Sequence, residues 1–420
     1  MPLRPHQTDA LDSMANHTKG QIIVPTGGGK TMCMIEDAKR GGTIVVVAPR
    51  ILLAQQLSSE FLEILDDVSV MHVHSGETPH YSSTKANDIA DWTLLNRLFG
   101  KNSLIFTTYH SLHRVQESGI PVDTIYFDEA HNSVNRNFFP STEFYGTGGA
   151  SRCFFFTATP KHSLTIQKAG MNNREVYGDV IINVPAPKLV DEGYILPPKV
   201  EVYKSRLLKK DEIYSEVESE HMIDAIDRLK VDKVLICAKS TKQIIGLLSQ
   251  SDFCYDLSVR GYSWMTITSR TGAIINGKKV GRDEFFDTLN AWGKDDEKKF
   301  VVLHHSILAE GINVKGLEAA LFMRNMDYIT ISQTIGRVIR LGNVNKTHGK
   351  VCVPVYNNVG ISTARKVEAV VDTVFNRGEP AISVITRWRN LIMTSIIRQS
   401  TLQLKKIANF IVLEGENKEC

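Results

Sequence analysis

The stretch QIIVPTGGGKT, residues 21–31, decides the fold of this chain. Its first four residues have the apolar character of a buried strand, and a helical pattern begins near Met32. The glycines between them let backbone N–H groups approach phosphate oxygens, and the start of the helix adds a favourable partial positive charge. Lys30 is placed to reach the β- and γ-phosphates of a nucleotide, and the Thr31 hydroxyl is placed to ligate Mg²⁺. We therefore predict a phosphate-binding loop formed by Pro25, Thr26, Gly27, Gly28, Gly29, Lys30 and Thr31.

This loop departs at one position from the strict pattern G-x-x-x-x-G-K-[ST], because Val24 stands where the first glycine belongs. The alternative is a glycine-rich turn that binds nothing. A Lys–Thr pair directly after three glycines, between a strand and a helix, favours the phosphate-binding interpretation.

Apolar runs alternate with amphipathic helical patterns over the first half of the chain. The runs cover residues 21–24, 43–48, 68–73, 104–107, 124–127 and 153–156. Strands that are apolar on both faces and alternate with helices indicate a parallel sheet covered on both sides. Ligands of such sheets bind at the carboxyl ends of the strands, so we expect the chemistry in the loops that follow these runs.

The alternation stops at residues 185–198, PAPKLVDEGYILPP, whose prolines suggest an extended linker. It resumes with runs at residues 200–203, 234–238, 265–268, 300–303, 319–323 and 351–355. We therefore expect an α/β fold of two doubly wound parallel-sheet lobes in tandem, residues 1–184 and 199–378. Residues 379–420 are predicted to form a short C-terminal helical extension. Two lobes joined by a linker form a cleft that can open and close.

The composition is that of a soluble globular protein, with 42% hydrophobic and 23% charged residues among 420 and a formal net charge of +3. This small charge excludes a protein that coats nucleic acid by charge alone, although one basic groove could still bind a strand. The six cysteines form no C-x-x-C pair, which disfavours a zinc ribbon and suits a reducing cytoplasm. No stretch of about 18 apolar residues appears, so we expect a soluble, cytoplasmic protein with no membrane partner.

An acidic pair follows the apolar run at residues 124–127, in the sequence DEAH. Asp128, at the end of a strand, can hold Mg²⁺ directly or through water, and Glu129 can orient the attacking water. An acidic pair after a strand is often only the start of a helix, but the phosphate loop in the same lobe favours the metal-and-water interpretation. A second metal site is disfavoured because four other histidines have no cysteine or carboxylate at ligand spacing. These are His72, His74, His304 and His305.

Nine motifs in this order resemble those of superfamily 2 DNA helicases and translocases. They are LRPHQ (3–7), PTGGGKT (25–31), APRILLAQQ (48–56), TTYHSL (107–112), DEAH (128–131), TATP (157–160), LICAKSTKQ (235–243), LAEGINVKGL (308–317) and QTIGRVIRLG (333–342). The last motif reads Q-x-x-G-R-x-x-R, which differs from the RNA helicases that share the DEAH spelling. It is closer to short phage or organellar helicases of the branch-migration type.

This resemblance implies two RecA-like lobes that bind ATP and Mg²⁺ between them. It implies that Gln7 faces the adenine with Arg4 nearby, and that Gly311 and Asn313 of the second lobe also contact the nucleotide. Asn313 stands where the family often has aspartate, so a carboxylate role is not transferred to it. The residues implied to couple hydrolysis to movement are His131, Thr157 and Thr159.

Arg337 and Arg340 are three residues apart and therefore share a helix face, with Gln333 one turn earlier. The resemblance implies that both arginines reach across the cleft to the phosphates. The alternative is a solvated basic helix face. Apolar neighbours such as Ile335 and Val338 bury this helix, and buried arginines need anionic partners, which favours arginine fingers. The predicted catalytic set is Lys30, Asp128, Glu129, Gln333, Arg337 and Arg340.

Candidate contacts to a nucleic-acid backbone are small polar and basic residues that follow the predicted strands. They are Arg50, Ser75, Gly76, Thr107, Thr108 and Ser111 in the first lobe, and Lys239, Ser240, Thr241, Ser269 and Arg270 in the second. Each of them alone could equally be a turn residue or a helix cap. They form a credible set because they fall where the family places its strand contacts.

The sequence thus predicts an ATP-dependent DNA helicase or translocase that acts on single-stranded or branched DNA. We expect it to work as a monomer, alone or with replication, recombination or repair proteins. Three alternatives stay open: an RNA-dependent ATPase of the same fold, a clamp that binds ATP without hydrolysing it, and the motor subunit of a restriction-type complex. The intact Glu129 and Arg340 disfavour the clamp, and the restriction motor would need a partner to supply its nuclease.

Overall fold

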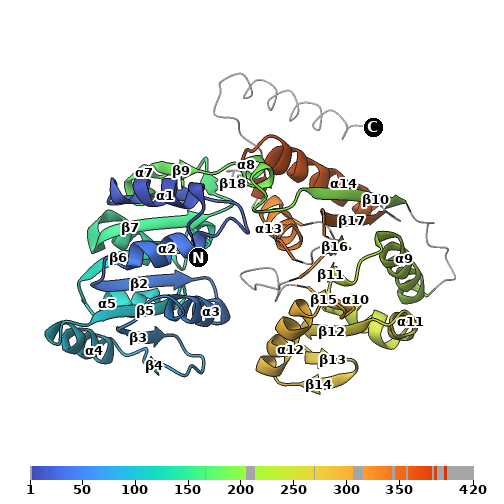
Figure 1. Ribbon diagram of the computed structural model, residues 1–420, viewed down its shortest axis with the longest axis horizontal. Helices are drawn as coiled ribbons and strands as arrows, with labels where there is room; N and C mark the ends of the chain where they lie inside the picture. The colour runs from blue at the N-terminus through green and yellow to red at the C-terminus, as the bar shows by residue number, and fades with distance from the viewer. Residues whose placement is uncertain are drawn as a thin grey trace.

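The computed structural model describes residues 2–165, 167–204, 213–268, 270–305, 316–324, 326–342, 346–355, 358–380, 383–385 and 392–394. It contains two lobes side by side, each built on an eight-stranded sheet with helices packed against it (Figure 1). The predicted α/β architecture of two tandem RecA-like lobes is therefore confirmed. Within the described residues, no helix combines the length and the apolar character needed to cross a membrane.

The sheet of lobe 1 is parallel at every pairing among its described strands, in the order β4-β3-β5-β2-β6-β7-β1-β9. Its strands are β1 (Lys19–Ile23), β2 (Thr43–Ala48), β3 (Val68–Val73), β4 (Tyr81–Ser82), β5 (Asn102–Thr108), β6 (Val122–Phe127), β7 (Ala150–Thr157) and β9 (Val180–Asn183). Strand β2 is buried along its whole length because both of its faces are covered. Ile44 and Val46 pack on one side, and Val45 and Val47 pack on the other.

Different helices cover the two faces of this sheet. One face carries α1 (Pro5–Ala15), α2 (Lys30–Ala38) and α3 (Ile51–Leu62), and the other carries α4 (Ala86–Leu98) and α5 (Leu112–Glu117). The shorter elements of lobe 1 are η1 (Ala130–Asn132), α6 (Phe139–Phe144), η2 (Tyr145–Gly149), β8 (Lys161–Ser163) and α7 (Arg174–Tyr177). Since all the strands run in one direction, their carboxyl ends and the loops that follow lie along one edge of the sheet.

The sheet of lobe 2 has the order β10-β17-β16-β11-β15-β12-β13-β14. Its parallel strands are β10 (Pro198–Lys204), β11 (Lys233–Cys237), β12 (Ser263–Thr268), β15 (Phe300–His304), β16 (Ala319–Phe322) and β17 (Gly349–Val355). The helices are α9 (Tyr214–Leu229), α10 (Thr241–Ser249), α11 (Phe253–Val259), α12 (Arg282–Lys294), α13 (Tyr328–Val338), α14 (Asn358–Val370) and η3 (Val371–Asn376).

A hairpin that was not predicted extends lobe 2 beyond β12. Strands β13 (Gly272–Ile275) and β14 (Lys278–Val280) are antiparallel to their neighbours. Asn276 and Gly277 connect them with φ values of 46° and 84°, the positive values that a tight two-residue turn needs.

The prediction of an extended linker at residues 185–198 is wrong in its first half, where α8 (Ala186–Asp191) is helical. Its proline lies in the first turn, where a missing N–H costs no helical hydrogen bond. The second half joins lobe 2: Ile195 forms an isolated bridge with Arg340, and the Leu196 N–H donates to the Ile339 carbonyl at 2.7 Å. The linker is therefore packed structure.

The prediction of a helical C-terminal extension at residues 379–420 is contradicted by the parts that the structure describes. Ser383–Ile385 forms strand β18 and Ile392–Thr394 forms strand β19. Strand β18 pairs in parallel with β8 of lobe 1, so the chain returns to the first lobe after leaving the second. Residues 395–420 lie outside the described residues.

Candidate nucleotide site between the lobes

The predicted phosphate loop connects β1 to α2 and depends on its glycines. Gly27 and Gly29 have φ values of 88° and 86°, a left-handed conformation that disfavours other residues. At Gly28 a Cβ atom would lie 2.5 Å from Cγ1 of Val24. Val24, the residue that departs from the strict motif, thus occupies space that only a glycine at position 28 leaves open. Helix α2 begins at Lys30, two residues before the predicted start near Met32, so Lys30 and Thr31 lie in its first turn.

The first turn of α1 holds the carbonyl groups of this loop. The Arg4 guanidinium donates to the Gly27 carbonyl at 3.3 Å, and the Gln7 amide donates to the Gly29 carbonyl at 3.2 Å. Between them, Nε2 of His6 lies 2.7 Å from the Gly28 carbonyl, to which it donates in the matching tautomer. Burial lowers the pKa of His6, which favours the neutral ring. His6 was missed from the sequence, although it stands inside the LRPHQ motif between two predicted residues.

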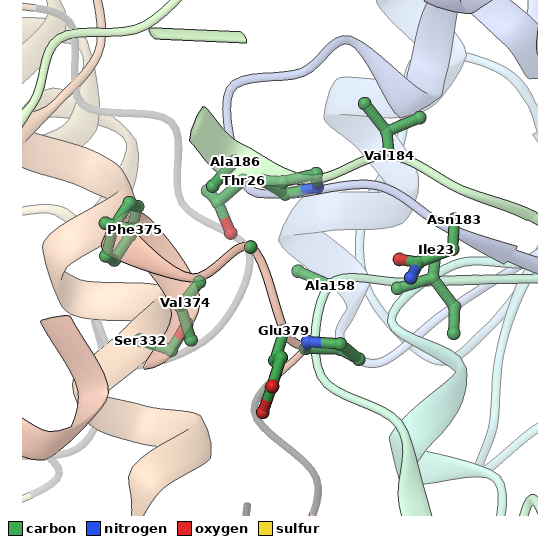
Figure 2. A pocket seen from close by; sticks show the side chains of 14 residues that line it. Ile23, Thr26, Ala158, Asn183, Val184, Ala186, Ser332, Val374, Phe375 and Glu379 are labelled. Atoms are coloured by element: carbon green, nitrogen blue, oxygen red, sulfur yellow. The ribbon is translucent and has the colours of Figure 1, made fainter. Parts of the chain in front are cut away.

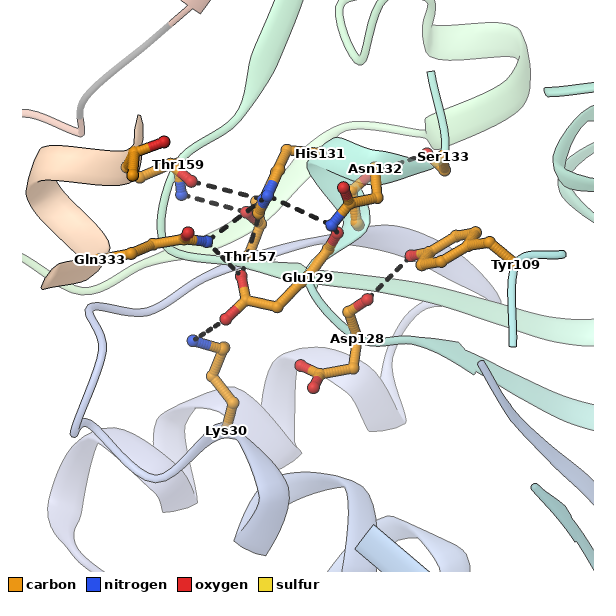
Figure 3. Close-up of polar contacts among 12 residues, drawn as sticks. Lys30, Tyr109, Asp128, Glu129, His131, Asn132, Ser133, Thr157, Thr159 and Gln333 are labelled. Atoms are coloured by element: carbon orange, nitrogen blue, oxygen red, sulfur yellow. Dashed lines mark hydrogen bonds and ion pairs between the residues drawn. The ribbon is translucent and has the colours of Figure 1, made fainter. Parts of the chain in front are cut away.

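The acidic pair follows β6 at the carboxyl edge of the sheet (Figure 3). Burial raises the pKa of Asp128 to about 7, and the neighbouring Glu129 carboxylate acts in the same direction. Burial alone would also raise the pKa of Glu129, but Lys30, His131 and Arg337 together lower it. Nζ of Lys30 is 3.9 Å from Oε1 of Glu129. The two carboxyl groups therefore differ, with Glu129 held in its charged form.

The donor set fits Mg²⁺ bound together with nucleotide phosphates. Among the described residues, no group of three or more His, Cys, Asp or Glu side chains could hold a metal by itself. Mg²⁺ bound with a nucleotide needs no such group, because phosphates and water supply most of its oxygen ligands. Asp128 offers a buried carboxylate at the carboxyl edge of the sheet, and the hydroxyl of Thr31 is the second predicted ligand.

A hydrogen-bond network links this pair to the other motifs (Figure 3). Nδ1 of His131 lies 3.1 Å from the Thr157 hydroxyl and 3.4 Å from the Thr159 hydroxyl. From lobe 2, the Gln333 amide donates to Oε2 of Glu129 at 3.4 Å and lies 3.4 Å from Nε2 of His131. The structure thus brings the three predicted coupling residues together with two predicted catalytic residues, Glu129 of lobe 1 and Gln333 of lobe 2.

Both predicted arginine fingers lie at the lobe interface. Arg337 is 5% exposed near the end of α13, and its charge helps to lower the pKa of Glu129. Arg340 lies two residues beyond that helix, not within it as the shared-face argument assumed. Burial lowers the pKa of Arg340, while the carboxylates of Glu60 and Glu129 oppose this shift. Its Cγ lies 3.5 Å from where a Cβ on Gly27 would be, so it reaches the phosphate loop.

The segment after α13 that carries Arg340 is held by backbone contacts with two other parts of the chain. On one side Ile195 of the linker forms its bridge with the Arg340 backbone. On the other side Nζ of Lys346 donates to the Arg340 carbonyl at 2.8 Å and to the Leu317 carbonyl at 2.7 Å. Lys346 was not predicted from the sequence, because its role depends on contacts with two separate segments.

The lobes meet closely beside the phosphate loop. A Cβ atom on Gly336 of α13 would lie 2.4 Å from Cβ of Thr26, so this contact requires glycine. A small pocket opens next to it, with walls from both lobes (Figure 2). Thr26 and Ala158 come from lobe 1, and Ser332 and Val374 come from lobe 2. The shape of this pocket therefore depends on how the lobes sit relative to each other.

Two of the candidate nucleic-acid contacts, Thr107 and Thr108, are the last residues of β5, and the other described candidates come after β2, β3, β5, β11 and β12. Arg50 precedes α3, and the exposed Arg270 follows β12. Two candidates have structural roles: Thr107 is fully buried and its hydroxyl donates to the Val73 carbonyl, and the Ser240 hydroxyl caps α10 by accepting from the Gln243 N–H. Side-chain contact of Thr107 with a strand is therefore not supported. Ser269, Gly311 and Asn313 lie outside the described residues.

Comparisons with known proteins agree with this geometry. Residues 1–162 match the family described as Type III restriction enzyme, res subunit. The structure resembles the ATP-dependent Type ISP restriction-modification enzyme LlaBIII bound to DNA, with a TM-score of 0.68 and 17% identity over 98% of this chain and 32% of that one. It also resembles the E. coli DExH-box NTPase HrpB, with a TM-score of 0.54 and 12% identity over 88% of this chain and 43% of that one. A search of curated proteins gives no match.

The tandem-lobe fold is shared with these solved structures, the ordered motifs resemble those of superfamily 2 helicases, and residues 1–162 match the restriction-subunit family. The family match covers most of the first lobe. The chain spans about a third of the length of the Type ISP enzyme that it matches.

Proposed function

We propose that this protein is an ATP- and Mg²⁺-dependent motor that couples hydrolysis between its lobes to movement along, or remodelling of, single-stranded or branched DNA. The observation that carries the proposal is the contact of Gln333 with Glu129 and His131 across the lobe interface. Residues of both lobes share one site, so the state of the nucleotide can control how the lobes sit relative to each other. The site is complete within one chain, which suits a monomeric motor unit.

The predicted residues divide the chemistry among them. The backbone of residues 27–29 and the Lys30 ammonium bind the phosphates, while Asp128 and Thr31 would hold Mg²⁺, which neutralises charge on them. Glu129 is charged at neutral pH because cations surround it, so it can accept a hydrogen bond from water and orient it. Arg337 and Arg340 supply positive charge from lobe 2 to the phosphoryl group in transit.

Coupling follows from the network around His131. Departure of the γ-phosphate changes the groups around the Glu129 carboxylate. Gln333 donates a hydrogen bond to this carboxylate, and His131 lies 3.6 Å from it. His131 also contacts Thr157 and Thr159 at the end of β7. A change at the phosphate therefore reaches both the other lobe and the loop after β7, and it alters the distance between nucleic-acid contacts on the two lobes.

DNA is the favoured track because the Type ISP relatives in the comparison are DNA-bound enzymes: LlaBIII is described as bound to DNA, and LlaGI as in complex with a DNA substrate mimic. An RNA-dependent ATPase of the same fold stays the alternative. ATPase stimulation by single-stranded DNA and by RNA of the same sequence separates the two. Unwinding assays on forked, four-way and blunt DNA then define the substrate.

The described cysteines are all free thiols, which suits the reducing cytoplasm that we propose.

The motor mechanism is tested by Arg340→Ala, with the exposed Arg365→Ala of α14 as a control. We expect the Arg340 variant to bind ATP but to lose nucleic-acid-stimulated hydrolysis by orders of magnitude, as loss of an arginine finger does. The control variant should keep wild-type turnover. Near-normal stimulated ATPase in Arg340→Ala would refute a site shared between the lobes.

A second candidate function is the motor of a restriction-type complex. It is favoured by the match of residues 1–162 to a restriction-enzyme subunit and by the likeness of the fold to the Type ISP enzymes. In that case the chain alone should hydrolyse ATP and translocate without cutting DNA. Cleavage of long DNA should appear only after a nuclease-bearing partner is added. ATP-dependent strand separation by the chain alone on short forked DNA would instead favour the helicase.

A further inference from the structure

Helix α4 carries apolar side chains on both of its faces. Its inner face packs against β5 and α5 through Ile89, Thr93 and Asn96, which are buried. Its outer side exposes Leu94, Leu95 and Leu98 by 59%, 54% and 74%, and Phe99 directly after the helix is 71% exposed. Single exposed leucines are ordinary on protein surfaces, but these four large apolar side chains lie within six consecutive residues.

The spacing of these residues gathers them into one stripe. Positions three and four apart share a helix face, so Asp91, Leu94, Leu95 and Leu98 lie together, opposite the buried face. We call these four residues and Phe99 the α4 stripe. Figure 1 places α4 at the outer edge of lobe 1, away from the lobe interface. The stripe is therefore separate from the nucleotide site between the lobes.

Opposite charges mark the two ends of the stripe. Asp91 is exposed at its N-terminal end, and Lys101 is exposed just after its C-terminal end. Two other charges nearby already have partners: Arg97 pairs with Asp123 at 3.0 Å, and Asp88 accepts from the Ser83 hydroxyl at 2.7 Å. A surface with a leucine centre and unlike charges at its ends is complementary to a copy of itself turned end for end.

We propose that α4 packs antiparallel against α4 of a second copy of this chain, forming a dimer with twofold symmetry. In this arrangement Leu94 faces the partner's Leu98, and Asp91 faces the partner's Lys101, with each contact made twice. Burial of the leucines drives the association, and the two charge pairs select the antiparallel direction. Each chain keeps a complete site between its own lobes, so the dimer joins two motor units through their outer edges.

The test begins with the mass of the full chain in solution. Light scattering or sedimentation over a concentration series should give twice the 47.0 kDa chain mass at high concentration and a shift to the monomer on dilution. Leu98→Asp should be monomeric over the same range, with basal ATPase and circular dichroism unchanged because this side chain is exposed. Val259→Asp on α11, at a residue 66% exposed, is the matched control and should remain dimeric.

Charge exchange then tests the direction of packing. Asp91→Lys alone and Lys101→Asp alone should each weaken dimerisation, because each places like charges opposite each other in both symmetry-related pairs. The double variant should recover the wild-type dissociation constant. A wild-type chain that stays monomeric at its highest soluble concentration overturns the proposal, as does a dimer that Leu98→Asp leaves intact. Failure of the double variant to recover overturns the antiparallel pairing.

Discussion

Glu129 is a buried carboxylate that keeps its charge because cations surround it. Burial raises its pKa, but Lys30, His131 and Arg337 together more than offset this effect. For the adjacent Asp128, burial and the Glu129 carboxylate raise the pKa to about 7. Two adjacent carboxyl groups in one site therefore have different properties, which suits different roles in binding the metal and orienting water.

Replacing Glu129 by glutamine should separate nucleotide binding from hydrolysis. Lys30 and Asp128 remain in Glu129→Gln, so we expect ATP and Mg²⁺ to bind with little change in affinity. Hydrolysis should fall by orders of magnitude, and the ATP-loaded protein should bind single strands more tightly. Fluorescent-nucleotide titration and phosphate-release kinetics measure the two steps separately. Loss of ATP binding would instead assign Glu129 to the metal or to the fold.

At the scale of elements, helix α13 contacts the phosphate loop closely because Gly336, opposite Thr26, has no side chain. In Gly336→Ala the new methyl group would lie 2.4 Å from Cβ of Thr26, so α13 and the phosphate loop must separate. We expect a modest loss of stability, about 1–3 kcal/mol as for other overpacked sites. ATPase should fall sharply, because Gln333 and Arg337 on the same helix move away from the phosphates. Gly281→Ala, where a Cβ meets nothing within 4 Å, should keep normal ATPase.

Nζ of Lys346 donates hydrogen bonds to the carbonyls of Arg340 and Leu317 and so positions the segment after α13. Lys346→Met removes both hydrogen bonds, so we expect kcat of the stimulated ATPase to fall while the KM for ATP changes little. Lys346→Arg should recover part of the activity, because a guanidinium can also donate to two carbonyls. Steady-state kinetics of the three proteins decide this. A rise in KM alone would show that Lys346 does not position Arg340.

The same lysine predicts a pH dependence of stability. Burial lowers the pKa of Lys346 from 10.5 to about 8, so the unfolded chain binds more protons at this group between those two values. Stability of the wild type relative to Lys346→Met should therefore rise as the pH increases from 8 to 10.5. A neutral amine still has two N–H donors, which match its two carbonyl partners. Denaturant unfolding of both proteins across this range measures the difference, and a falling difference would contradict the argument.

Elements were predictable where one physical signal dominated. Residues 43–48 were predicted as a strand because they are apolar on both faces, and β2 has these bounds. The helix α8 was missed because the prolines in and around it suggested extended chain, although proline is tolerated in a first helical turn. The β13–β14 hairpin was missed despite the Asn-Gly pair at its turn, which is a signal for such hairpins. The contacts of Gln333 and Lys346 depend on tertiary packing, which no local pattern reveals.

At the scale of the whole molecule, one apolar cluster runs through both lobes and the linker. It includes Phe156 of lobe 1, Leu189 and Ile195 of the linker, and Phe375 after α14. The linker is therefore packed against both lobes through buried side chains, beyond connecting them along the chain. This feature explains why a segment with four prolines is ordered.

Leu189 tests this continuity because it is fully buried where the linker meets the phosphate loop. Its Cδ1 would lie 3.1 Å from a Cβ on Gly28. Leu189→Ala should destabilise the protein by about 2–5 kcal/mol, as buried leucine truncations do. If the lobes depend on the shared cluster, we expect the wild type to unfold in one transition and the variant to unfold in two. Denaturant unfolding followed by circular dichroism and by tryptophan fluorescence detects this, and a loss below about 0.5 kcal/mol, typical of surface sites, would contradict it.

The backbone of Glu129 carries one further consequence, for the balance between stability and activity. Its φ of 46° and ψ of 52° lie in the left-handed region, which costs a residue with a side chain about 1–2 kcal/mol. Glycine is free of this penalty, so Glu129→Gly should be more stable than Glu129→Ala, the reverse of the order found at most positions. Both variants lack the carboxylate and should be inactive. Glycine at position 129 would favour stability, whereas glutamate is needed for hydrolysis. A rise in melting temperature on substitution by glycine would therefore mark a catalytic position without any assay of catalysis.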